Sequence, residues 1–362
     1  MECRLLYVVG QLGLGGLERQ LFYLIRSMDR ARYKPVVAVW GDSSDDHYAR
    51  ELRALNVPVV RLGQSSTRWA KLRALSSLVS EIQPEVIHSY TFYTNIAVWW
   101  SVQGTRTLPI GSVRGNFIMD YRQVGKVFGK LCGRWPAAQV FNSITAEQNA
   151  RETTTFFRPR RCYVVRNGID LELFSPRPHA QRGYILAVGS MYPVKRWDRL
   201  IRAVAFLTSK GMQFEVLHVG SGPLQQQLER MVKNLCLEHV VRFLGARHDI
   251  PTLIAGAEFL VHTAEAEGCP NVIMEAMACG RAVVATSAGD SPFLVEDGLT
   301  GFVVAKEDEV AFADRMKTLL EDRELCFQMG AAGRKKAVDS FGLDRLRSEV
   351  FAAYRAEGWK DT

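Results

Sequence analysis

Short apolar runs rich in valine and isoleucine alternate along this chain with longer stretches of helical periodicity. Such runs favour β-strands, and the intervening stretches place apolar residues on one face of a helix. The strands predicted in the first half are residues 5–9, 35–40, 57–62, 86–88, 109–113, 139–142 and 162–165. Those predicted in the second half are residues 185–188, 214–219, 240–244, 259–261, 282–286 and 301–304. Because strands that alternate with helices build parallel sheets covered on both faces, and because these strands are too many for one sheet, the sequence predicts two α/β domains.

The composition supports two packed domains in a reducing compartment. The chain has 362 residues, of which 47% are hydrophobic, and a chain of this size commonly divides into domains. Its seven cysteines include no Cys-x2-Cys pair, which indicates free thiols rather than a disulfide framework. No apolar run approaches the ~18 residues of a membrane span, and the first residues lead directly into a strand rather than a signal peptide. We therefore expect a cytoplasmic protein.

The formal net charge of +8 has three interpretations. The surface is generally basic and solvated, or it attracts an anionic donor and acceptor or an anionic membrane face, or it binds nucleic acid. Nucleic acid is not an expected partner, because no basic block is interleaved with aromatic residues. The seven histidines show no ligand spacing and no Asp-x-Asp pair is present, so we expect no metal and no other cofactor.

The most informative local pattern is the run 267–280 between two predicted strands. A polar loop leads into a helix that Pro270 opens and Gly280 closes. The amides at such a helix start can hold a phosphate. Two acids, Glu267 and Glu275, flank this position, and the helical repeat places Glu275 away from the apolar face. Because carboxylates repel phosphate, their presence is explained better by binding to ribose and sugar hydroxyls.

This pattern, Glu-x7-Glu with Gly268 after the first acid and Glu-Ala-Met-Ala-Cys-Gly around the second, resembles the signature of the family-four retaining glycosyltransferases. Those are two-domain enzymes of the GT-B architecture that use nucleotide-sugar donors. The similarity extends along nearly the whole chain, in the family's order. The further segments that carry it are residues 13–19, 167–170, 188–195, 220–223, 241–245 and 297–301.

The resemblance implies an α/β fold with two Rossmann-like domains facing a central cleft. Residues 1–175 would form the acceptor domain and residues 176–340 the nucleotide-sugar domain. The polar stretch 175–182, with two prolines, would link them. The C-terminal helix, within residues 341–362, would cross back and pack on the first domain, where its apolar stripe would be buried.

The resemblance also implies the site residues. Lys195 would bind the donor diphosphate, Glu275 the ribose and Glu267 the hydroxyls of the transferred sugar, and these three are the catalytic candidates. The remaining donor-binding candidates are Gly15, Gly16, Ser190, Arg196, Gly220, Arg247, Gly268, Cys269, Pro270, Asn271 and Val272. Two of these have simpler alternatives, since the glycines around Gly15 and Gly220 could each make an ordinary strand-to-helix turn. A dinucleotide fingerprint at Gly13–Gly16 is disfavoured, because Glu18 stands where it would need a glycine.

Two positions depart from the family pattern. Ser190 stands where the family has an arginine, so either Arg196 compensates or Ser190 bonds the phosphate while Lys195 carries the charge. After the strand 109–113 many members have a histidine, whereas this chain has Arg114. His88 is expected to pack or to orient a loop rather than to act as a base. In retaining transfer the leaving diphosphate can accept the proton, so no protein base is required.

The expected activity is therefore metal-independent transfer of a sugar, with retention, from a nucleoside diphosphate sugar. A UDP-sugar is favoured over a GDP-sugar, and the acceptor would be a glycan, a lipid-linked or a small-molecule hydroxyl, in cell-surface polysaccharide synthesis. The alternative is a non-catalytic subunit that binds nucleotide sugar or scaffolds a glycan-assembly complex. Ser190, which stands where the family has an arginine, favours that alternative. The presence of both Glu267 and Glu275 argues against it.

One further segment, residues 121–136, carries basic residues at every fourth position with apolar residues beside them. These basic residues are Arg122, Lys126, Lys130 and Arg134. The pattern fits either a solvated charged helix face or a basic amphipathic helix on anionic lipid. The second interpretation predicts peripheral contact with the inner face of the cytoplasmic membrane.

Overall fold

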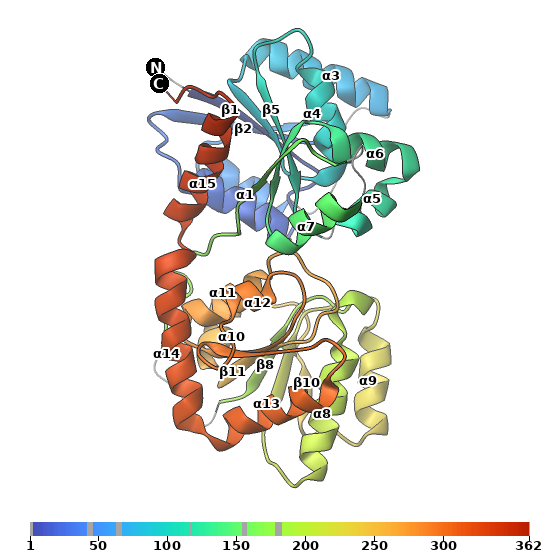
Figure 1. The fold of residues 1–362 in the computed structure, drawn as a ribbon, viewed down its shortest axis with the longest axis vertical. Helices are drawn as coiled ribbons and strands as arrows, with labels where there is room; N and C mark the ends of the chain where they lie inside the picture. The colour runs from blue at the N-terminus through green and yellow to red at the C-terminus, as the bar shows by residue number, and fades with distance from the viewer. Residues whose placement is uncertain are drawn as a thin grey trace. The chain divides into compact units, whose positions relative to one another are not determined.

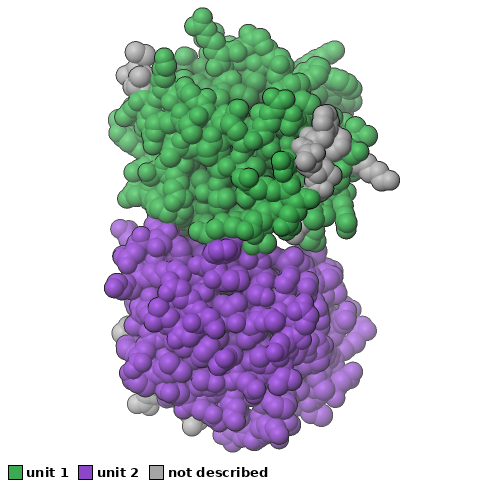
Figure 2. Space-filling model, viewed as in Figure 1, with its two compact units in different colours: residues 1–168, 343–362 green, residues 169–342 purple. Residues whose placement is uncertain are grey.

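The computed structural model describes residues 3–41, 46–62, 67–115, 117–153, 158–177 and 183–361. It contains two compact units. Unit 1 is Met1–Gly168 together with Leu343–Thr362, and unit 2 is Ile169–Gly342, shown in green and purple in Figure 2. The chain leaves unit 1 after Gly168, so the predicted boundary near residue 175 lies a short way inside unit 2. Residues 178–182 of the predicted linker lie outside the described residues.

Unit 1 contains a parallel sheet in the order β3-β2-β1-β4-β5-β6-β7. The strands are β1 Cys3–Val9, β2 Tyr33–Val39, β3 Val59–Arg61, β4 Val86–Ser89, β5 Leu108–Val113, β6 Ala138–Phe141 and β7 Arg161–Val164. Each strand predicted for the first half of the sequence is present. The central strand β1 is buried at nearly every position and pairs with both β2 and β4, as expected for a parallel sheet covered on both faces.

Helices cover this sheet, as Figure 1 shows. They are α1 Gly16–Arg26, α2 His47–Ala54, α3 Arg68–Ile82, α4 Asn95–Ser101, α5 Phe117–Val124, α6 Lys126–Arg134, α7 Ile144–Thr153 and the C-terminal α15 Leu343–Ala356, with a short 3-10 turn η1 Phe92–Thr94. In Figure 1, α15 lies beside the N-terminal elements of unit 1, where it contacts α1. Its apolar stripe, Leu346, Val350 and Tyr354, is fully buried in the same core as Leu21 and Leu24. The predicted return of the C-terminal helix to the first domain is confirmed.

The return depends on a close contact at Gly168. A Cβ atom at this glycine would lie 2.9 Å from the Leu346 Cβ of α15, so a larger residue would push the helix away. The buried Gln20 amide of α1 also binds Gly168 twice: it donates to the carbonyl and accepts from the N–H, each at 2.8 Å. These contacts hold the end of the unit 1 segment against two helices.

Unit 2 contains a second parallel sheet, in the order β10-β9-β8-β11-β12-β13. Its strands are β8 Ile185–Val188, β9 Val216–Val219, β10 Val241–Phe243, β11 Phe259–His262, β12 Ala282–Thr286 and β13 Gly301–Val304. Its helices are α8 Trp197–Ser209, α9 Gln225–Asn234, α10 Ile250–Gly256, α11 Asn271–Ala278, α12 Ser291–Leu294, α13 Glu309–Glu321 and α14 Arg323–Ser340, with a 3-10 turn η2 Pro193–Lys195. Each strand predicted for the second half is present, and the two-domain α/β prediction is confirmed.

The basic segment 121–136 differs from its prediction. It is divided between α5 and α6 rather than forming one helix, because Gly125 between them has a positive φ of 94°. A left-handed residue interrupts helical hydrogen bonding, so Arg122 lies on a different helix from Lys130 and Arg134. The expected continuous basic stripe is therefore broken.

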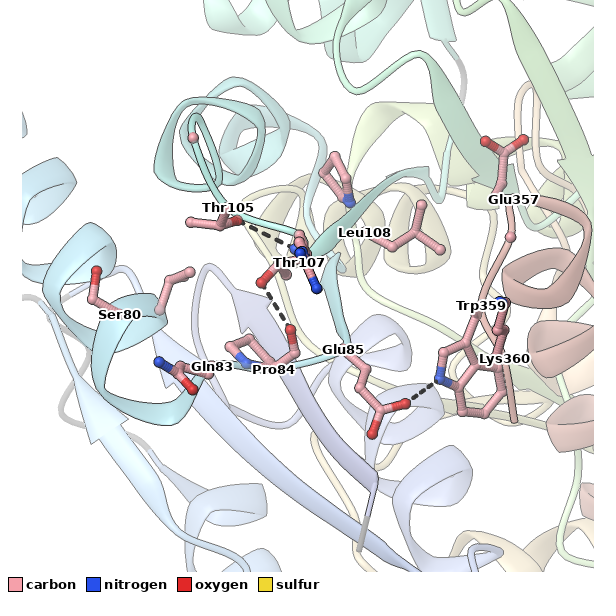
Figure 3. Close-up of a pocket in the computed structure, with 15 residues that line it drawn as sticks. Ser80, Gln83, Pro84, Glu85, Thr105, Thr107, Leu108, Glu357, Trp359 and Lys360 are labelled. Carbon is pink, nitrogen blue, oxygen red and sulfur yellow. Dashed lines mark hydrogen bonds between the residues drawn. The ribbon is translucent and has the colours of Figure 1, made fainter. Parts of the chain in front are cut away.

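A cavity of about 860 Å³ lies in unit 1 at the amino ends of β4 and β5 (Figure 3). Its polar groups already bond to one another: Thr107 Oγ1 donates to the Pro84 carbonyl at 2.8 Å, and Trp359 Nε1 donates to Glu85 at 2.9 Å. Ligands of open α/β sheets bind at the opposite, carboxyl edge. In the part of the chain that the structure describes, no helix is both long and apolar enough to cross a membrane.

Candidate active site

The sequence-predicted donor residues of unit 2 gather at the carboxyl edge of its sheet. The loop after β8 carries Ser190, Lys195 and Arg196, and the loop after β11 carries Glu267. Strands β8 and β11 are neighbours in the sheet although three helices and two strands separate them in sequence. This is the point at which the strand order reverses, where open parallel sheets bind ligands.

Lys195 and Glu267 meet at this edge. The Lys195 ammonium forms an ion pair with Glu267 Oε1, and His262 Nε2 lies 3.2 Å from the same oxygen. Burial alone would raise the pKa of Glu267, but the charge of Lys195 and the hydrogen bond of His262 outweigh it and lower the pKa to about 2. Glu267 is therefore an anion at any physiological pH, with Lys195 held beside it.

Backbone contacts fix the Lys195 loop against the loop after β11. Thr263 Oγ1 donates to the Lys195 carbonyl at 2.8 Å, and the Glu265 N–H donates to the Val194 carbonyl at 2.8 Å. The next residue, Arg196, has a left-handed backbone with φ of 51°, an unfavourable conformation for a residue with a side chain. Tertiary contacts therefore hold this turn in place, and with it the position of Lys195.

The side chain of Arg196 is committed to other carboxylates. Its Nε lies 3.0 Å from Asp198 Oδ1, and its Nη1 lies 3.3 Å from Glu265 Oε2. Glu265 is shared with the buried Arg199, at 2.5 Å. Two carboxylates already neutralise the Arg196 guanidinium and occupy its N–H donors, so it would bind a diphosphate more weakly. Ser190 is exposed, and its carbonyl accepts from Trp197 Nε1 at 3.0 Å.

Glu275 differs from its prediction. Instead of pointing away from the core, it is only 2% exposed. The residues Ile273–Cys279 are all buried, because α11 is enclosed by β11, β12, α10, α12 and α14. Burial and the charge of Glu275 raise the pKa of the Cys279 thiol to about 12. The helix repeat correctly identified one apolar face, but the second face is covered as well.

The start of α11 is formed as expected, with one shift. Pro270 precedes the helix as its cap and Asn271 is the first helical residue, while Gly280 ends it with φ of 69°. Gly268 and Cys269 are buried, and Val272 and Asn271 are partly exposed. The adjoining loop approaches closely at Gly289, where a Cβ would lie 2.4 Å from the Gly268 carbonyl oxygen.

Gly220 and Arg247 complete the unit 2 candidates. Gly220 has φ of 137°, and a Cβ there would lie 2.0 Å from the Gly189 carbonyl oxygen. The glycine therefore lets the loop after β9 pack on the loop that carries Ser190 and Lys195. Arg247 is exposed and pairs with Asp249 at 2.8 Å, so its guanidinium has a local partner.

Gly15 and Gly16 lie in unit 1, after β1 and at the start of α1. A side chain covers the backbone amides at the start of this helix. A Cβ on Gly15 would lie 2.0 Å from Glu18 Oε2, so the carboxylate of Glu18 packs directly on this glycine. Burial raises the pKa of Glu18, which is 7% exposed. A phosphate at this position would have to displace a side-chain anion.

His88 packs in the unit 1 core, as predicted. Its Nδ1 lies 2.6 Å from Tyr354 Oη and its Nε2 lies 2.8 Å from Ser112 Oγ, so both ring nitrogens have partners. Burial and the nearby charge of Arg114 lower the pKa of His88 well below its usual value. The imidazole is neutral and links β4 and β5 to α15.

Comparison with known families decides the assignment. The family model described as "Glycosyl transferases group 1" matches residues 182–322, and the one described as "Glycosyltransferase Family 4" matches residues 14–173. The first match lies within unit 2, and the second covers most of the N-terminal segment of unit 1 and ends just inside unit 2. The chain belongs to glycosyltransferase family 4.

Curated and solved proteins resemble this family 4 chain. It is 29% identical over 170 residues to N-acetyl-alpha-D-glucosaminyl L-malate synthase of Bacillus anthracis, covering 47% of this chain and 44% of the relative. It is 31% identical over 194 residues to the N-acetylgalactosamine-N,N'-diacetylbacillosaminyl-diphospho-undecaprenol 4-alpha-N-acetylgalactosaminyltransferase of Campylobacter jejuni, covering 52% of each. The chain thus spans about half the length of the curated relatives it matches.

Among solved structures, Anabaena HepE in complex with UDP and glucose matches with a TM-score of 0.84 and 22% identity, covering 98% of this chain and 100% of the other. At this identity the match shows the fold, which is GT-B.

One site residue of this family 4 chain was missed from the sequence. His262 ends β11 and is 1% exposed, and only its contact with Glu267 marks it as part of the site. Its position directly after the predicted strand 259–261, five residues before the first acid, was the available signal. Among the described residues, no group of three or more His, Cys, Asp or Glu side chains is arranged to hold a metal ion.

Proposed function

We propose that this chain transfers a sugar, with retention at the anomeric carbon and without a metal ion, from a nucleoside diphosphate sugar to a hydroxyl acceptor. The observation that carries the proposal is the ion pair of Lys195 with Glu267 at the carboxyl edge of β8 and β11. It places one cation and one anion at the position where a parallel sheet binds ligands. Unit 2 would hold the donor and unit 1 the acceptor.

Lys195 would act on the leaving group. As the bond between the sugar and the diphosphate breaks, negative charge grows on the diphosphate, and an ammonium already in place stabilises it without reorganisation. Only 21% of the Lys195 side chain is exposed, so solvent screens it less than a surface lysine. Phosphate would share Lys195 with Glu267, which keeps the ammonium oriented when the site is empty.

The carboxylates would bind hydroxyl groups. Glu267, held ionised by Lys195 and His262, is a strong acceptor for hydroxyls of the transferred sugar. Glu275 would bind the ribose, and because it is buried, the donor would have to reach it along the start of α11. The helix start at Gly268–Val272 would supply amide donors to the diphosphate. The proton of the acceptor hydroxyl would pass to the leaving diphosphate oxygen.

The donor and acceptor classes rest on similarity. The complex of HepE with UDP and glucose supports a UDP-sugar in preference to a GDP-sugar. The names of the two relatives mention a small hydroxy acid and a lipid-linked saccharide, and these support a small-molecule, lipid-linked or glycan acceptor. A role in cell-surface polysaccharide synthesis in the cytoplasm is the matching cellular proposal.

The test is donor turnover. Hydrolysis and transfer would be measured with a panel of UDP- and GDP-sugars, with and without a chelator. Turnover of a UDP-sugar that chelator leaves unchanged, with an α-linked product from an α-linked donor, would support the proposal. Donor binding without any turnover across the panel would favour the non-catalytic subunit instead.

We also propose that unit 1 contacts an anionic membrane surface through α5 and α6. Helix α6 carries exposed apolar side chains, Val127 at 67% and Phe128 at 43%, together with the basic residues Lys130 and Arg134. The neighbouring helix α4 exposes Trp100, which packs edge-on against exposed Trp69 of α3. Exposed aromatic residues beside basic ones suit a lipid interface.

A further inference from the structure

A second cavity, of about 580 Å³, lies in unit 1. It is lined by segments that follow β2, β4 and β5, including Trp40, residues 91–93 and Arg114, and by Leu17 of α1. The strand order reverses between β1 and β4, next to this cavity. It therefore occupies the edge of the unit 1 sheet at which open α/β sheets bind ligands.

Arg114 is the unusual residue of this cavity. None of its three side-chain nitrogens has a hydrogen-bond partner among the described residues, and all three are shielded from solvent. The guanidinium lies over the ring of Tyr90, with Cζ 4.2 Å from the centroid. A cation–π contact replaces only part of the hydration that a buried guanidinium loses.

The polar groups near Arg114 are occupied or neutral. His88, whose pKa the Arg114 charge helps to lower, is bonded at both ring nitrogens to Tyr354 and Ser112. No hydrogen bond or ion pair joins Arg114 to Asp120, the acid in the same cavity, in the part of the chain that the structure describes. The charge of Arg114 is thus left for a ligand to neutralise.

The remaining lining suits a small hydroxylated anion. Arg68 at the start of α3 adds a second cation, which lies over Phe128 at 5.0 Å. Asp120 of α5 is a carboxyl without a protein partner in the described residues, and burial raises its pKa to about 6. Phe92, Ile96 and Leu72 close the rest of the cavity with apolar surface. Two cations and one carboxyl favour an oxyanion that also carries a hydroxyl group.

We infer that this cavity binds an acceptor with a compact oxyanion, a phosphate monoester or a carboxylate, next to its hydroxyls. Arg114 turns from the Tyr90 ring to pair with the oxyanion, Arg68 adds to the positive potential, and Asp120 accepts a hydrogen bond from a hydroxyl. That this ligand is the acceptor rests on the proposed glycosyl transfer. Oxyanion binding in unit 1 can be measured without any glycosyl transfer.

The test is calorimetric titration of the full chain at constant ionic strength, with sulfate and with glycerol 3-phosphate as probes. Arg114→Gln should weaken both by roughly tenfold to a hundredfold, the value of a charge-assisted hydrogen bond. Asp120→Asn should tighten sulfate, because it removes a like charge. The matched control is Arg122→Gln, which removes an equal charge from exposed α5 and should change neither affinity. The effect of Arg114→Gln should persist in Lys195→Ala, which separates this cavity from the donor site.

A stability readout distinguishes a binding arginine from a structural one. Because the Arg114 side-chain nitrogens are shielded from solvent and have no hydrogen-bond partner among the described residues, Arg114→Gln should keep or raise the melting temperature without probe, and it should abolish the rise that glycerol 3-phosphate produces in the wild type. A marked loss of stability with unchanged probe binding would overturn the inference. If transfer to an acceptor that carries a phosphate or a carboxylate proceeds normally in Arg114→Gln, the inference fails while the proposed function stands. If the probes bind through Arg114 but no nucleotide sugar is turned over, the proposed function fails while oxyanion binding in unit 1 stands.

Discussion

His262 Nε2 lies 3.2 Å from Glu267 Oε1, the same carboxylate oxygen that pairs with Lys195. The imidazole comes from the end of strand β11 and the carboxylate from the loop that follows it. Glu267 is therefore held from two sides, by a cation of one loop and by a ring fixed in the sheet. This makes His262 a positioning residue for the proposed sugar-binding acid.

Replacing His262 with Leu should lower transfer by roughly tenfold, because Glu267 loses a hydrogen bond to its charged form. The same loss should raise the pKa of Glu267 and move the acid limb of the rate profile to higher pH. His218→Leu is the matched control. His218 is a buried histidine of β9 whose ring nitrogens have no hydrogen-bond partner among the described residues. An unmoved acid limb in His262→Leu would show that the contact has no influence on Glu267.

The acid dependence of stability should depend on Glu267. Its pKa falls from 4.5 to about 2 in the folded chain, so the folded state favours the ionised form. The resulting stabilisation, roughly 3 kcal/mol, is fully present above the unfolded-state pKa and is lost as pH falls toward 2. Urea unfolding between pH 7 and pH 3 should show a steeper loss in the wild type than in Glu267→Gln. Parallel curves for the two proteins would contradict the pairing with Lys195.

Lys195→Ala should reduce turnover by roughly 10²–10³ with a smaller effect on donor binding, because the charge it meets grows in the transition state. Arg196→Gln should have a much smaller effect, since Arg196 already pairs with Asp198 and Glu265. Steady-state kinetics of both variants provide the comparison. A larger loss in Arg196→Gln than in Lys195→Ala would mean that Arg196 supplies the diphosphate charge.

Ser190→Arg should tighten UDP binding by roughly tenfold, because it adds a charge-assisted hydrogen bond at an exposed position where the family has an arginine. Ser190→Gln, of similar reach but without charge, serves as control. Equal UDP affinities in wild type, Ser190→Arg and Ser190→Gln would place the diphosphate elsewhere. The measurement needs only UDP, so it does not depend on the acceptor.

Gly220→Ala should destabilise unit 2 by about 3 kcal/mol or more, because its methyl group would lie 2.0 Å from the Gly189 carbonyl oxygen, far inside van der Waals contact. Gly211→Ala is its control, since Gly211 also has a positive φ but has nothing within 4 Å of the added atom. That change should cost only about 1 kcal/mol. The free energy of unfolding would be measured by chemical denaturation. Similar decreases in the two variants would mean that the loop around Lys195 moves to accommodate the methyl group at little cost.

The proposed membrane contact should depend on both charge and apolar surface. Replacing Arg122, Lys126, Lys130 and Arg134 with Gln should abolish salt-sensitive binding to vesicles that contain anionic lipid, at about 1 kcal/mol per charge. Val127→Ser with Phe128→Ser should weaken the binding that persists at high salt. Hydrolysis of a soluble donor should continue in both variants. If the wild-type chain does not bind such vesicles at low salt, the membrane contact is wrong and α6 is a solvated surface.

The local periodicity of the sequence was sufficient for the fold. Each predicted strand is present, and the motif order identified the family. The reason is that strand and helix patterns depend on neighbouring residues, and parallel α/β units follow from their alternation. The break at Gly125 was the exception, because a glycine can continue or end a helix, and packing decides which.

The composition of the site was only partly readable from the sequence. The signature identified Lys195 and Glu267 by resemblance, but that these two residues form an ion pair, with His262 completing the cluster, depends on strands β8 and β11 becoming neighbours. The ion pair of Arg196 with Glu265 depends likewise on the two loops that this strand pairing brings together, whereas Asp198 lies only two residues away in sequence.

The sequence by itself determined the strands, the helices and the identity of the signature residues, since these follow from spacing along the chain. Only the tertiary structure decided that Glu275 is buried on an enclosed helix and that Arg114 lines a cavity with no hydrogen-bond partner for its side chain among the described residues. Burial and pairing are properties of contacts between distant segments, and the free energy of a charge depends on those contacts rather than on its neighbours in sequence.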